Sequence, residues 1–123
     1  MRVIDAVQEL ERPIKITVES VESSRIIRII GDVDTVTAPE LDLTLSSWRA
    51  ERAETLLIDM QSVTYISSMG LRVFLSHLKK MRGSGSRMVL CGASHLVTDI
   101  FRMSGFTSFF DMFENLDAAM AEH

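Results

Sequence analysis

The unbroken apolar run Leu56-Leu57-Ile58 is the feature that most limits how this chain can fold. A strand with one buried face alternates apolar and polar residues, whereas a continuous run is typical of a strand covered on both faces, as in a parallel sheet. Thr55 and Met60 bound the run. We therefore expect residues 55–60 to form a central strand of an α/β domain.

Strict apolar–polar alternation over residues 14–19 predicts a half-buried strand. Residues 22–24 supply a turn and residues 25–30 a second strand, so the two should form an antiparallel hairpin at one edge of the sheet. Helical and strand patterns then alternate. The expected segments are a helix over 38–50, the strand over 55–60, a helix from Ser67 or Ser68, a strand over 87–92, a helix after Ser94, a strand over 109–113 and a helix after Asn115.

This order predicts a single-domain α/β fold, with a mixed, largely parallel β-sheet of about five strands packed with about four α-helices. The domain should span residues 14–123. Residues 1–13 are expected to be an N-terminal extension, with weak helical spacing over Val3, Ile4, Val7 and Leu10.

Two helix details follow from local pattern. Thr37 and Glu40 have the spacing of a capping box, which predicts that the Thr37 hydroxyl caps the helix over 38–50. For the helix after Ser94, helical spacing predicts an inner face made of Leu96, Ile100 and Met103.

Charge and composition argue against several classes of partner. The net charge is −4, and the only basic cluster, residues 79–82, fits a helix C-terminus better than a nucleic-acid site. No apolar run approaches the ~20 residues that cross a bilayer, and the N-terminus does not resemble a signal peptide. The single cysteine, Cys91, lies in an apolar run and fits a core position in a reducing cytosol. We expect a cytoplasmic protein with no nucleic-acid or membrane partner.

The chemistry of the chain centres on Ser67 and Ser68, which place hydroxyls at the start of a helix and just beyond a sheet edge. One interpretation is that both serines only cap the helix. Catalysis would need a base, and His95, which follows another strand, is the candidate. The chain lacks a Gly-x-Ser-x-Gly elbow, a phosphate-binding loop and metal-ligand spacing, so we expect neither an enzyme nor a cofactor or metal.

Residues 59–71 resemble the signature of the STAS family, in particular the small bacterial anti-anti-sigma factors, which are anti-sigma factor antagonists. The family pattern is an aliphatic strand, then Asp-x-x-x-Val-x-x-Ile-Asp-Ser-x-Gly-Leu and an amphipathic helix. The matching residues are Asp59, Val63, Ile66, Ser68, Gly70 and Leu71. Ser67 stands where the family prototypes have Asp. The resemblance extends over Ile14 to Phe113 and includes the loop before Pro39.

This resemblance implies a regulator that binds an anti-sigma factor while unphosphorylated and thereby releases a sigma factor. The implied partner has a GHKL-type ATP-binding fold and phosphorylates Ser68, with Ser67 as a second choice, and a PPM-type serine phosphatase reverses the modification. The implied contact residues are Asp32, Asp34, Thr35, Thr37, Ser67, Ser68, Met69 and Arg72. Two alternatives stay open: a STAS module in a signalling complex without a sigma factor, and a small ligand-binding or hydrolytic domain that uses the serine and His95.

Overall fold

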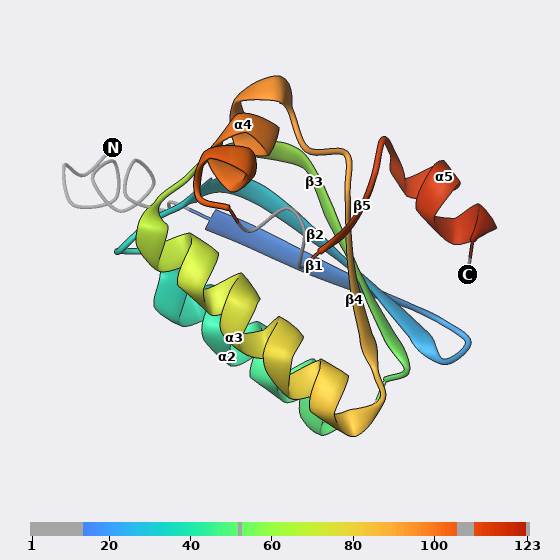
Figure 1. Ribbon diagram of the computed structural model, residues 1–123. Helices are drawn as coiled ribbons and strands as arrows, with labels where there is room; N and C mark the ends of the chain where they lie inside the picture. The colour runs from blue at the N-terminus through green and yellow to red at the C-terminus, as the bar shows by residue number, and fades with distance from the viewer. Residues whose placement is uncertain (1–13, 52, 106–109, 123) are drawn as a thin grey trace, which may run out of the picture.

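One five-stranded sheet, with strand order β1-β2-β3-β4-β5, organises the chain. The computed structural model describes residues 14–51, 53–105 and 110–122 (Figure 1). The elements are β1 (Ile14–Val21), β2 (Ser24–Val33), α2 (Ala38–Ala50), β3 (Thr55–Ile66), α3 (Ser68–Ser84), β4 (Arg87–Cys91), α4 (His95–Met103), β5 (Asp111–Phe113) and α5 (Leu116–Ala121). The expected extension over residues 1–13 lies outside the described residues.

The expected hairpin and parallel sheet are both present. β1 pairs with β2 in the antiparallel sense, and the pairs β2–β3, β3–β4 and β4–β5 are parallel. The α/β fold class predicted from the sequence is therefore confirmed.

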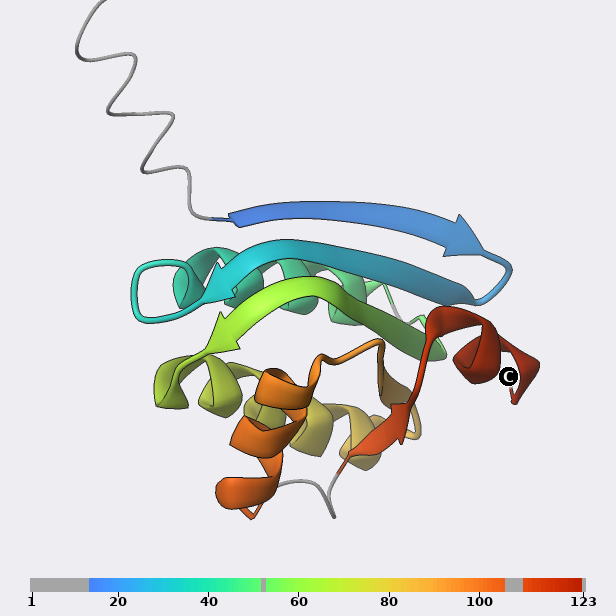
Figure 2. The same cartoon turned by 90° about the horizontal axis from the view of Figure 1, so that it is seen from above.

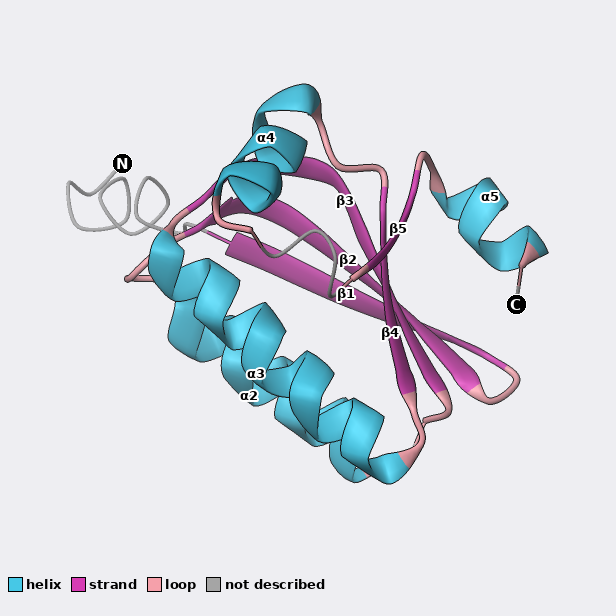
Figure 3. Ribbon diagram, viewed as in Figure 1, coloured by secondary structure: helices cyan, strands magenta, loops and turns pink. Residues whose placement is uncertain are grey.

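The central run is covered on both faces, as its lack of alternation indicates. Leu56 and Ile58 belong to the larger core, whereas Leu57 belongs to a smaller cluster that includes Ala119 of α5. Because successive strand residues point to opposite faces, these two clusters lie on opposite sides of the sheet. α2 and α3 run side by side on one face and α5 covers part of the other (Figures 1, 2 and 3).

β3 is longer than expected. It does not end at Met60 but continues to Ile66, where its register with β2 shifts twice. Val63 and Ile66 are buried, so this bulged segment still contributes to the core although most of its other residues are polar and exposed. A bulge lets a strand keep its pairing while losing strict alternation, which explains why the alternation pattern did not extend the predicted strand beyond Met60.

The inner face of α4 also differs from the prediction. Val97 and Phe101 are fully buried, whereas Leu96 and Met103 are 55% and 87% exposed. Ile100 is half-buried and packs against the core, as predicted. Phe101 packs edge-on against Phe110, with ring centroids 5.3 Å apart. The predicted face and the buried pair Val97 and Phe101 both have helical spacing. Contact between aromatic rings on different elements decides which of the two faces the core.

At the end of the chain, the last strand covers Asp111–Phe113 rather than the expected 109–113, and residue 109 is not described. Asn115 caps α5 as expected, since its Oδ1 accepts a hydrogen bond from the N–H of Ala118 at 2.8 Å.

Candidate functional site

The residues singled out by the sequence gather where β2 and β3 end. β2 leads into the loop of residues 34–37, and β3 leads directly into α3. Because these strands are parallel neighbours, both exits lie at the same end of the sheet, as Figure 2 shows. The carboxyl ends of parallel strands are where α/β proteins commonly place their binding sites.

The two serines at the start of α3 have different environments. Ser67 is the N-cap, and its Oγ accepts a hydrogen bond from the N–H of Gly70 at 3.3 Å. The N–H of Ser67 donates to the carbonyl oxygen of Val33 at 2.8 Å, which anchors the helix start to the end of β2. Ser68 is the first helical residue, and it is exposed. The capping role predicted for this pair is thus carried by Ser67.

Gly70 allows this anchoring. A Cβ atom at position 70 would stand 2.7 Å from the Val33 carbonyl oxygen and 2.8 Å from its Cγ1. Real Cβ atoms do not approach other atoms so closely, so the Ser-x-Gly spacing of the sequence has a steric cause here. The glycine lets the first turn of α3 lie directly against β2.

The loop before α2 is held by its own side chains. Thr37 occupies the N-cap position of α2 as predicted, but the predicted side-chain bond of the capping box is wrong. Thr37 has helical backbone angles and makes no side-chain cap; its hydroxyl donates to the Asp32 carbonyl oxygen at 2.8 Å. The Asp34 carboxylate instead closes the loop itself, because its Oδ1 accepts from the N–H groups of Val36 and Thr37, which precede α2, at 2.9 and 3.1 Å. The Asp32 carboxylate accepts from the hydroxyl of Thr64, which joins the loop to β3.

Burial divides the predicted contact residues into two groups. Thr37 is 1% exposed, so it shapes the loop but offers no surface. Thr35, Ser68, Met69 and Arg72 are exposed, while Asp32, Asp34 and Ser67 are half-buried.

A groove of about 270 Å³ lies between the starts of α2 and α3. It joins the loop to the helix start, because Thr35 and Met69 both line it. The other lining residues are Ala38, Pro39, Asp42 and Val73. Met69 is 41% exposed at this groove, and Val36, at the tip of the loop, is 76% exposed. The arrangement presents apolar side chains beside the exposed residue Ser68, which suits docking of another protein.

His95 lies at another place in the fold. It is an exposed residue of a separate depression, formed between α4 and the end of β5 and lined in part by Thr98 and Phe113. Ser68 is not among the residues that line this depression. Across residues 14–51, 53–105 and 110–122, His, Cys, Asp and Glu side chains form no group of three that could hold a metal.

Cys91 is buried, as its apolar neighbours predicted, and its thiol contacts the carbonyl oxygen of Ile58 at 3.5 Å. Burial, and secondarily the Asp59 carboxylate, raise the pKa of the thiol to about 11. A cysteine that stays protonated is a poor nucleophile.

A buried polar link between α2 and α3 was not predicted. His77 is 1% exposed; its Nε2 lies 2.6 Å from Asp42 Oδ1, and its Nδ1 accepts from Arg49 Nε at 3.3 Å. Since Nδ1 is an acceptor, Nε2 carries the proton and donates to Asp42. Burial lowers the pKa of His77 below 6.5, against the opposing effect of Asp42. The only signal in the sequence was a histidine within an amphipathic helix, which is not specific.

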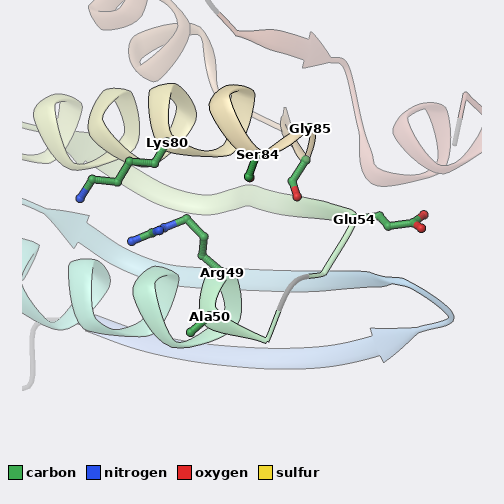
Figure 4. Close-up of a pocket in the computed structure, with 7 residues that line it drawn as sticks. Arg49, Ala50, Glu54, Lys80, Ser84 and Gly85 are labelled. Atoms are coloured by element: carbon green, nitrogen blue, oxygen red, sulfur yellow. The ribbon is translucent and has the colours of Figure 1, made fainter.

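Arg49 also borders a larger hollow of about 650 Å³ at the other ends of α2 and α3. Figure 4 shows Arg49 and Lys80 coming from the two helices toward this hollow, with Ser84 and Gly85 at the end of α3. Helix C-termini carry partial negative charge, which these cations offset. The hollow begins at Lys80, about 18 Å along α3 from Ser68, so it is separate from the docking groove.

The fold and the Ser-x-Gly helix start define a family. The model of the STAS domain matches residues 15–119, and the chain therefore belongs to the STAS domain family.

Two curated relatives extend over most of the chain. The candidate anti-sigma factor antagonist BtrV of Bordetella bronchiseptica is 31% identical over 107 residues, which cover 87% of this chain and 92% of the relative. The anti-sigma-B factor antagonist of Listeria monocytogenes is 30% identical over 94 residues, which cover 76% of this chain and 82% of the relative.

Solved structures share the fold. An anti-sigma factor antagonist from Mycobacterium paratuberculosis superimposes with a TM-score of 0.82 at 23% identity, covering 89% of this chain and 92% of that one. The Bacillus cell fate determinant SpoIIAA in its phosphorylated form gives a TM-score of 0.69 at 17% identity, covering 88% of this chain and 98% of that one. Among the described residues of this chain, no helix is both long enough and apolar enough to span a membrane.

Proposed function

We propose that this protein is an anti-sigma factor antagonist that is switched by phosphorylation of Ser68. In the unphosphorylated form it binds an anti-sigma factor with a GHKL-type serine kinase fold and thereby releases a sigma factor. The same partner phosphorylates Ser68, and a PPM-type phosphatase restores the binding form. The names of the two relatives support this role. We assign it to residues 14–123, with residues 1–13 as an extension, and we propose that the protein acts by binding in the cytoplasm, without catalysis.

The observation that carries the proposal is the difference between the two adjacent serines. The Ser67 hydroxyl is half-buried and occupied by the N–H of Gly70, whereas Ser68 is exposed at the first position of α3. A kinase can therefore reach the Ser68 hydroxyl without opening the helix cap. This favours Ser68 over Ser67 as the phosphate acceptor.

A phosphate on Ser68 is compatible with the fold. It adds about −1.5 to −2 charges at a helix N-terminus, where free N–H groups and the helix dipole stabilise anions. Arg72 lies one helical turn further on, at the i+4 position, and is exposed. Helical side chains lean toward the N-terminus, so the Arg72 guanidinium can form a charge-assisted hydrogen bond to the phosphate. Modification should thus change the surface while the domain stays folded.

The change of surface should be enough to release the partner. Ser68 adjoins Met69, an exposed residue of the docking groove. Asp34, half-buried in the loop across from the helix start, already contributes negative charge at this end of the molecule. A phosphate beside the groove adds bulk and further negative charge. An acidic partner surface would then be repelled and an apolar side chain displaced from the groove.

Binding to the cognate anti-sigma factor tests the proposal. Ser68→Asp should abolish capture of that factor, and peptide mass spectrometry after incubation with it and ATP should place one phosphate on Ser68. Ser76→Asp is the matched control, because it adds the same charge at an exposed site two turns along α3. Capture of Ser68→Asp at the wild-type level, or phosphate at another residue, would refute the switch.

A further inference from the structure

Among the described residues, β1 is an edge strand that no strand pairs with on its outer side. Within the described residues it pairs with β2 alone, and it is the outermost strand of the sheet in Figure 2. In the described part of the chain, Ile14–Val21 is paired on one side along its full length, and the other side presents a row of backbone donors and acceptors. Ile16 and Val18 are half-buried at this edge and pack against the core. Such an edge is a template for another strand.

The side chains of β1 are self-complementary in one register. If two copies pair in the antiparallel sense about Thr17, each Lys15 stands directly opposite the Glu19 of the other copy. Lys15, Thr17 and Glu19 are exposed and alternate along one face of the strand. On the other face, Ile16 stands opposite Val18. Opposite charges, paired threonines and paired β-branched residues are all favourable neighbours across an antiparallel ladder.

Other registers lose this match. A shift by two residues sets Lys15 opposite Thr17 or Val21 of the second copy, so its charge has no partner. A parallel pairing in register sets lysine beside lysine and glutamate beside glutamate, which is unfavourable. A lysine on an edge strand commonly discourages pairing. In the Thr17-centred register alone, that lysine favours pairing, and the register has the two-fold symmetry of a closed dimer.

We propose that β1 is a homodimerisation edge, in which two copies join antiparallel about Thr17 into one continuous sheet. Glu19 would then bridge Lys15 of the other copy and Arg28 of its own chain, to which it is already bonded at 3.1 Å. The groove beside Ser68 lies on α2 and α3, so both copies would keep it open for the partner. The dimer rests on β1 and is independent of the proposed antagonist role.

Sedimentation velocity of the full chain at low salt, over a range of concentrations, tests the dimer. The wild type should sediment as a dimer at the higher concentrations. Lys15→Glu sets two glutamates opposite each other in both halves of the interface, and Glu19→Lys sets two lysines there. Each variant alone should weaken association by about tenfold or more. Circular dichroism should show that both keep the fold.

Mixing the two variants determines the register. The Lys15→Glu copy carries glutamate at both positions and the Glu19→Lys copy carries lysine at both, so in a mixed pair every facing pair joins opposite charges. With one variant isotope-labelled so that the two masses differ, native mass spectrometry should therefore show more heterodimer than either homodimer, because each variant pairs only weakly with itself. A wild type that stays monomeric at every concentration overturns the proposal, including the case in which residues 1–13 cover the edge. A dimer that the charge changes leave intact overturns it as well, because another surface then forms the contact.

Discussion

The carbonyl oxygen of Val33 lies 2.7 Å from the position that a Cβ atom on Gly70 would occupy. This approach brings the end of β2 and the first turn of α3 together, and the hydrogen bond from the Ser67 N–H to the same oxygen reinforces it. Ser68 is displayed on the turn that these contacts hold in place.

Gly70→Ala should therefore destabilise the domain by about 2 kcal/mol, since overpacking against backbone outweighs the better helix propensity of alanine. Gly83→Ala is the matched control: it lies in the same helix with no atom within 4 Å of its would-be Cβ. That change should stabilise by up to about 1 kcal/mol. Urea unfolding measures both, and equal effects of the two substitutions would show that the contact with Val33 is not restrictive.

Ser67→Ala and Ser68→Ala should separate capping from modification. Loss of the Ser67 cap should reduce the free energy of unfolding by about 1 kcal/mol while phosphorylation continues. Ser68→Ala should leave stability nearly unchanged and abolish phosphorylation, because its exposed hydroxyl is the proposed acceptor. Denaturation and intact-mass measurements on the same samples decide this. Persistent phosphorylation of Ser68→Ala would identify a different acceptor.

Met69→Ala should weaken binding to the anti-sigma factor by about tenfold, because an exposed apolar side chain beside the groove is lost. Stability should change little, since the side chain is 41% exposed. Met103→Ala, at an 87% exposed position near the end of α4, is the control and should bind as the wild type does. Calorimetry gives both affinities. Equal affinity of the two variants would exclude the groove from the interface.

The buried His77 should make stability depend on pH. Its pKa in the folded protein lies below 6.5, because burial outweighs the attraction of Asp42 and acts together with Arg49 and Lys80. As the pH falls below 6.5, the unfolded chain binds a proton that folded His77 resists. Stability should therefore fall, by at most about 1.4 kcal/mol per pH unit for this proton. The His77→Gln variant should have a lower free energy of unfolding overall, but this free energy should change less with pH between pH 7.5 and about pH 5. An unchanged slope would assign the effect to other groups.

Much of the fold follows from local pattern. Alternation over β1, the continuous run in β3 and the cap before α3 each report the surroundings of a single element, so they can be identified without its partners. The extension of β3 to Ile66 could not be identified in this way, because its bulged pairing depends on β2. The missing side-chain cap at Thr37 has a similar cause, since the Thr37 hydroxyl donates to the Asp32 carbonyl oxygen of the loop.

The sequence by itself determined the strand and helix order and the start of α3 at two serines, because these depend on residue type and spacing. The need for glycine at position 70 comes from the tertiary contact with Val33. Only the tertiary structure decided that the Ser67 hydroxyl accepts a hydrogen bond from Gly70 while Ser68 is exposed, and that Thr35 and Met69 line one groove. It also decided that His77 is enclosed by Asp42 and Arg49. The physical reason is that solvent exposure and hydrogen-bond partners are set by segments distant in sequence, which meet only when the sheet and its helices are packed.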